Sequence, residues 1–80
     1  MSIARPNINN NLSNLSINDW LEIIDSYITS EIDRTIAKRY YIDGIPMIEI
    51  GAEVGYSRKG VSNRLKKIIK IIDKYASKVT

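Results

Sequence analysis

Apolar residues recur at intervals of three and four through most of this 80-residue chain, which is the spacing of amphipathic α-helices. We predict a first helix from Ser16 to about Ile28, because Ser16 and Asp19 form a partial capping box. Leu15 and Trp20 flank this cap at the positions of a hydrophobic staple. The apolar stripe of this helix comprises Ile17, Leu21, Ile24 and Ile28, widened by Trp20, Ile23 and Tyr27.

A second helix is predicted after Ser30, which is placed to act as an N-cap with Asp33 at the third helical position. It continues to Gly44, a residue type that ends helices. We expect one of Tyr40 and Tyr41 to be buried and the other to be partly exposed. The apolar stripe of this helix comprises Ile32, Ile36 and Tyr40.

Two further helices are predicted, over residues 46–54 and residues 58–76, with a tight turn between them. Gly55 stands where a left-handed residue ends the first of these helices, and Gly51 is the small residue that lets the two backbones approach. Ser57 is a suitable N-cap for the last helix. The apolar contacts across the turn are expected from Ile50, Val54, Tyr56 and Val61.

Together these segments predict an all-α fold. We expect one four-helix domain over residues 15–80, with a helix-turn-helix and a long C-terminal recognition helix. Residues 1–14 are polar, rich in asparagine and without apolar periodicity, and we interpret them as a flexible N-terminal arm. Eighty residues are enough for one small core, so no second domain is expected.

Composition limits the possible functions. The chain has no cysteine and no histidine, which excludes disulfides and thiolate or imidazole metal sites. It has no nucleophile-base arrangement and no glycine-rich phosphate loop, and we interpret the carboxylates of the first helix as a solvated face. We therefore expect no enzymatic activity, no catalytic or metal-binding residue and no cofactor. No apolar run approaches the ~20 residues of a membrane span, so we expect a cytoplasmic protein without a membrane partner.

Charge is divided sharply along the chain. Residues 1–50 contain four Lys or Arg and seven Asp or Glu, whereas residues 51–80 contain eight and two. Phosphate binding needs cations clustered on one surface. The basic second part of the chain therefore points to a nucleic acid.

Several motifs lie within residues 31–72: Asp43-Gly44-Ile45-Pro46, Ile48-Glu49-Ile50-Gly51, Val54-Gly55-Tyr56-Ser57-Arg58 and Val61-Ser62-Asn63-Arg64-Leu65-Lys66. Together they resemble region four of the bacterial sigma factors and small phage-type transcription regulators that share this module. The resemblance implies that the last helix enters the major groove of DNA. By this resemblance the groove is faced by Arg58, Lys59, Ser62, Asn63 and Lys66, with Ser57 near a phosphate.

The chain departs from the sigma pattern at two positions. Lys59 stands where sigma factors often have an acidic residue. Arg64 occupies a position that is commonly aliphatic, and we expect Leu65 to take over its packing role.

We hypothesise that the protein is a sequence-specific DNA-binding transcription regulator acting on double-stranded DNA. Arg58 or Lys59 suits guanine and Asn63 suits adenine, while lysines further along the helix contact phosphates. The alternative is a sigma-like interaction module that docks on RNA polymerase or another protein without DNA specificity. The candidate DNA-binding residues are Ser57, Arg58, Lys59, Ser62, Asn63, Lys66, Lys67 and Lys70.

We also expect a homodimer, because small helix-turn-helix proteins usually gain affinity by pairing across a two-fold operator. One candidate surface is a wide aliphatic arc on the last helix, and the other is Trp20 with Tyr27. A third possibility is that the arc covers the N-terminal helices of the same chain. The arc comprises Ile68, Ile69, Ile71, Ile72 and Tyr75.

Overall fold

The computed structural model describes residues 15–79, and the expected N-terminal arm over residues 1–14 lies outside the described residues. All regular secondary structure in the described part of the chain is helical, which confirms the predicted all-α fold of four helices. A single π-helical turn, η1, extends the second helix. The elements are α2 (Ile17–Tyr27), α3 (Glu31–Ala37), η1 (Lys38–Ile42), α4 (Met47–Val54) and α5 (Arg58–Val79).

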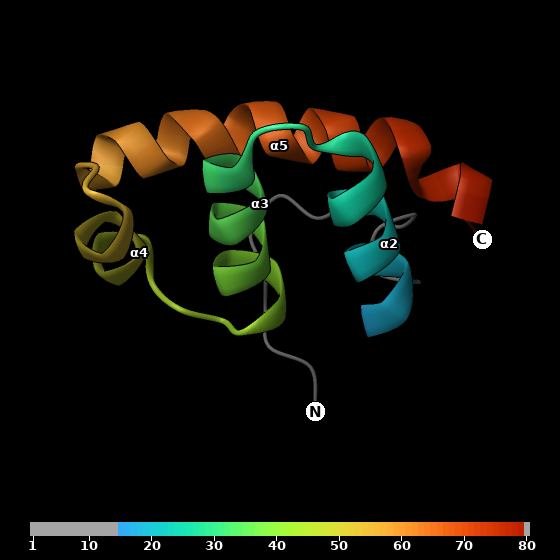
Figure 1. The fold of residues 1–80 in the computed structure, drawn as a ribbon, viewed down its shortest axis with the longest axis horizontal. Helices are drawn as coiled ribbons and strands as arrows, with labels where there is room; N and C mark the ends of the chain where they lie inside the picture. The colour runs from blue at the N-terminus through green and yellow to red at the C-terminus, as the bar shows by residue number, and fades with distance from the viewer. Residues whose placement is uncertain (1–14, 80) are drawn as a thin grey trace.

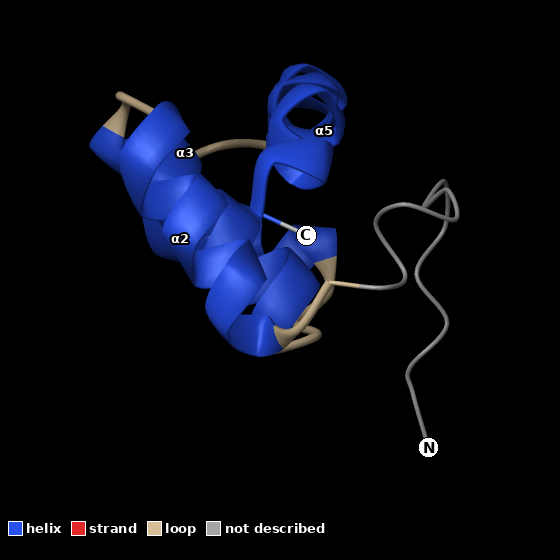
Figure 2. Cartoon of the chain, turned by 90° about the vertical axis from the view of Figure 1, so that its right-hand side faces the viewer, coloured by secondary structure: helices blue, strands red, loops and turns tan. Residues whose placement is uncertain are grey.

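The long helix α5 organises the molecule. It runs along one edge, with α2 and α3 crossing beneath it and α4 packed at its N-terminal end (Figure 1). Viewed nearly along its axis, α5 has the other helices on one side only (Figure 2). One face of α5 therefore lines the core, and the opposite face is open to solvent along the helix.

The predicted N-caps are confirmed. The Asp19 backbone N–H donates to Ser16 Oγ at 3.1 Å, and the Ser16 N–H donates to the Asp19 carboxylate at 3.2 Å, completing a capping box. The Asp33 N–H donates to Ser30 Oγ at 3.3 Å. Short-range sequence signals were sufficient here because each cap joins residues three positions apart.

The end of the second helix differs from a regular α-helix. From Lys38 to Ile42 the backbone forms a π-turn, and the Asp43 N–H donates to the Lys38 carbonyl at 3.0 Å. Tyr41 lies in this turn, is buried, and stacks on Trp20 with ring centroids 4.9 Å apart. Tyr40 is half-buried, so the prediction of one buried and one partly exposed tyrosine is confirmed.

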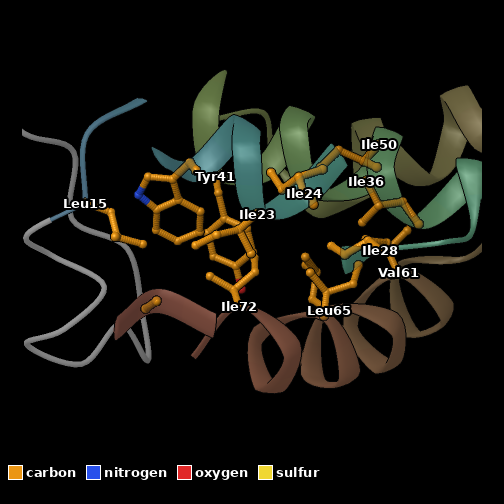
Figure 3. Close-up of a cluster of buried hydrophobic side chains, with 14 residues drawn as sticks. Leu15, Ile23, Ile24, Ile28, Ile36, Tyr41, Ile50, Val61, Leu65 and Ile72 are labelled. Atoms are coloured by element: carbon orange, nitrogen blue, oxygen red, sulfur yellow. The ribbon is translucent and has the colours of Figure 1, made fainter. Parts of the chain in front are cut away.

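The core lies between α5 and the three shorter helices (Figure 3). Three residues assigned to apolar stripes are instead exposed: Ile17 by 62%, Ile32 by 40% and Tyr27 by 36%. Ile17 and Ile32 lie in the first turn of their helices, where the apolar stripe extends beyond the core. The completely buried large side chains are Ile23, Ile24, Ile36, Ile50, Val61, Ile68 and Ile72.

Candidate nucleic-acid interface

The turn between α4 and α5 has the backbone geometry that its glycines predict. Gly55 adopts φ of 81°, in the left-handed region that favours glycine. The N–H groups of Gly55 and Tyr56 both donate to the Gly51 carbonyl at 2.8 Å. A Cβ atom at position 51 would overlap the carbonyl oxygen of Tyr56, so this close approach requires glycine.

The contacts across this turn place α5 firmly on α4. Ile50 and Val61 are completely buried, and Val54 and Tyr56 are half-buried around them. Ser57 caps α5, because its Oγ accepts from the Gly60 N–H at 3.0 Å. The predicted cap and apolar contacts of this helix pair are confirmed. The boundaries differ at two ends: Pro46 is the N-cap of α4 and not part of its first turn, and α5 continues to Val79 beyond the predicted end at residue 76.

The structure places the candidate DNA-binding residues on one side of α5 or at its start. Ser62 is the exception in exposure: it is half-buried and, with Tyr40, Met47 and Lys66, lines a cavity of about 90 Å³ at the edge of this face. The other seven candidates are exposed: Ser57, Arg58, Lys59, Asn63, Lys66, Lys67 and Lys70.

Within residues 15–79, the cations outside α5 are bonded within the protein. Lys38 Nζ lies 2.9 Å from the Asp25 carboxylate, which joins η1 to α2. Arg39 lies 3.2 Å from Asp43 and 3.0 Å from Glu53, which joins η1 to α4. The hydrogen bonds that the Arg39 guanidinium donates to Glu53 and Asp43 raise its pKa.

Arg34 is also bonded within the protein. Its guanidinium donates to the carbonyls of Ile28 at 2.7 Å and Thr29 at 3.1 Å. These bonds satisfy carbonyls at the end of α2 and in the following loop.

The cations on the open face of α5 have a different environment. In the described part of the chain, none of them is within ion-pair distance of a carboxylate. Their charge therefore faces solvent and makes this face strongly positive. We call this set the open cation face; it comprises Arg58, Lys59, Lys66, Lys67 and Lys70.

Arg64 lies on the same helix but does not belong to the open cation face. Its guanidinium is 2.7 Å from Asp33 Oδ1 on α3, and its Cζ lies 4.7 Å from the centroid of the Tyr56 ring. The hydrogen bond that it donates to Asp33 raises the pKa of Arg64. Leu65 is buried, which confirms that it takes over the packing role expected at this position. The contact of Arg64 with Asp33 was not predicted, since the two residues are 31 positions apart.

The proposed dimer surfaces are mostly occupied within one chain. Ile68 and Ile72 are completely buried and Trp20 is nearly so, which means that these side chains are not available to a second copy. Tyr27 stacks on Tyr75 with ring centroids 3.7 Å apart. The assignment of Ile68, Ile72 and Trp20 to a dimer interface is therefore wrong, because α5 is long enough to cover α2 and α3.

No group of three or more acidic, His or Cys side chains is arranged to hold a metal ion in the described region. None of the helices described is long and apolar enough to cross a membrane.

Comparison with known proteins adds no relative: no family model, no curated protein and no solved structure matches this chain.

Proposed function

We propose that the protein is a sequence-specific DNA-binding transcription regulator that inserts the N-terminal half of α5 into the major groove. The observation that best supports this proposal is the open cation face. It lies on the second helix of a helix-turn-helix, it has no carboxylate partners among the described residues, and the cations of the other helices are bonded internally. A DNA phosphate backbone supplies the missing partners.

The side chains on this face suit both base reading and phosphate binding. Arg58 or Lys59 pairs with guanine edges at the start of α5, and the exposed Asn63 amide pairs with the N6 and N7 groups of adenine. Lys67 and Lys70 bind phosphates, which position the protein without specifying sequence.

The length of α5 divides these roles along the helix. Its 22 residues extend about 33 Å at 1.5 Å per residue. The major groove is only about 12 Å wide, so a straight helix of this length leaves the groove after its first turns. Lys70 lies in the part of α5 that crosses the DNA backbone, whereas Asn63 lies in the part of α5 that faces the bases.

Selection of bound duplexes from a random DNA pool tests the function directly, and two variants then test the division of roles. Asn63→Ala is expected to relax the preference at one operator position and cost about 1–3 kcal/mol on the selected site. Lys70→Ala is expected to weaken all duplexes alike and to lower the salt slope by about one. Asn18→Ala, an exposed asparagine on α2, is the matched control and should change neither quantity.

The proposal fails if the pool yields no enriched sequence, or if Asn63→Ala leaves the ratio of specific to non-specific affinity unchanged while the protein stays folded. In that case the alternative becomes the better account: a module that docks on RNA polymerase or another protein through this basic surface.

We further propose that the protein binds DNA as a homodimer, since one short reading helix offers few base contacts. The selected sites should then contain two half-sites related by two-fold symmetry. Sedimentation at about tens of micromolar, with and without the selected duplex, measures the assembly state. A monomeric mass under both conditions contradicts the dimer but leaves DNA binding intact.

A further inference from the structure

Arg64 differs from every cation of the open cation face, although it lies on the same helix next to Asn63. Its side chain is 37% exposed, and the side chain of its partner Asp33 is 23% exposed. The guanidinium donates to Asp33 at 2.7 Å while lying over the Tyr56 ring. A DNA phosphate would have to displace an ion pair that is already formed.

These contacts join three elements around the start of α5. Asp33 lies in the first turn of α3, where Ser30 caps its backbone N–H. Tyr56 belongs to the turn that leads into α5. Arg64 therefore ties the reading helix to α3 and to its own entry turn.

These contacts control the rotation of α5 about its own axis, which apolar packing leaves loosely defined. The buried contacts of Val61 and Leu65 hold α5 on the core, but the hydrophobic effect is non-directional. A charge-assisted hydrogen bond is directional and fixes the rotation of the helix about its axis. Successive helical residues project at a fixed angle to each other. The rotation set at Arg64 therefore determines where Asn63 points.

We propose that Arg64 is a positioning residue: through Asp33 and Tyr56 it sets the orientation of α5 in which Asn63 faces the bases, and it does not bind DNA itself. The inference rests on the proposed function.

Asp33→Asn provides a test in which two explanations predict different results. Removing a carboxylate makes the protein more positive, so simple electrostatics predicts tighter binding to every duplex. Loss of positioning predicts instead that the ratio of specific to non-specific affinity falls roughly fivefold, the upper end for a part-exposed ion pair. Glu31→Gln removes an exposed carboxylate from the same helical turn and is the control, expected to leave the ratio unchanged.

A second pair of variants distinguishes positioning from phosphate contact. Lys67→Met removes a cation of the open cation face and should lower the salt slope by about one. Arg64→Met removes the same charge three residues away and should leave the slope at the wild-type value while lowering the specificity ratio. If Arg64→Met lowers the slope as Lys67→Met does, Arg64 contacts a phosphate and the inference is wrong.

A measurement without DNA separates this inference from the proposed function. Residual dipolar couplings of the backbone amides report the orientation of α5 relative to α3 in the free protein. Asp33→Asn and Arg64→Met should both change this orientation, whereas Glu31→Gln and Lys67→Met should preserve it. An unchanged orientation in folded Asp33→Asn overturns the positioning role whether or not the protein binds DNA. If these variants change the orientation but the protein selects no DNA sequence, the contacts of Arg64 do set the orientation of α5 and only the DNA-binding proposal is refuted.

Discussion

The cations of the helices other than α5, which we call the scaffold, have the same charge as those of the open cation face but the opposite environment. Lys38 and Arg39 reach carboxylates on neighbouring elements, and Arg34 reaches backbone carbonyls. The open cation face has no such partners in the described chain. Lys66 and Lys70, four residues apart on one helix face, repel each other and destabilise the helix slightly. The scaffold cations therefore stabilise the fold, whereas the open cation face needs an explanation outside the fold.

The stability of α5 must therefore come from its inner side. That side is continuously apolar and packs on all three shorter helices. Its buried residues are Val61, Leu65, Ile68, Ile72 and Ala76.

The largest expected effect compares two neighbours on α5, of which one is buried and the other exposed. Ile68→Ala removes a completely buried side chain and should lower the free energy of unfolding by about 2–5 kcal/mol, through lost burial and the cavity left behind. Lys67→Ala on the open cation face should change it by no more than about 0.5 kcal/mol. Urea unfolding of both variants measures the difference. Equal losses would mean that the outer side of α5 also supports the fold.

A smaller effect concerns a titratable group inside the scaffold. Burial raises the pKa of the Tyr41 phenol above its ordinary value of 10.0. The unfolded chain ionises this group first, so its contribution to stability is complete below pH 10.0 and is lost as the pH rises above that value. The loss should be about 1.4 kcal/mol per pH unit until the folded state also ionises.

Tyr41→Phe keeps the ring and removes this titration, so it should flatten the fall in stability between about pH 10 and about pH 11. Urea unfolding at several alkaline pH values measures the slope. Tyr27→Phe, at an exposed position, is the control. A Tyr41→Phe slope as steep as that of the wild type would assign alkaline unfolding to other groups.

The smallest effect tests the charge comparison itself. Lys38→Gln breaks the pair with Asp25 and should cost about 0.2–1 kcal/mol. Lys70→Gln relieves repulsion and should be neutral or stabilise the protein by a few tenths of a kcal/mol, about the size of one helix charge pair. Both differences should shrink as salt is added, because the charges are exposed. A Lys70→Gln loss as large as that of Lys38→Gln would show that the open cation face has a stabilising partner.

Local sequence signals were sufficient for the helix pair that presents the proposed site. Ser57 and Gly60 are three residues apart, and Gly51 and Gly55 are four apart, so each constraint acts within one or two helical turns. The exposure of Asn63 and Lys70 follows from helical periodicity once the apolar side of α5 is known. The π-turn at Lys38 was missed, because nothing in the local pattern distinguishes it from a regular helix end.

The all-α class, the helix caps, the glycine turn and the basic side of α5 could thus be predicted from the sequence, since these depend on residue type and short-range spacing. Which residues meet across elements depends on the packing of the helices. Ile68 and Ile72 cover α2 and α3 of the same chain, although their pattern suited a dimer surface equally well. Arg64 pairs with Asp33, although in sequence it looks like one more basic residue of α5. Helical periodicity shows which side of a helix is apolar or charged, but the partner of that side depends on how the helices pack in three dimensions.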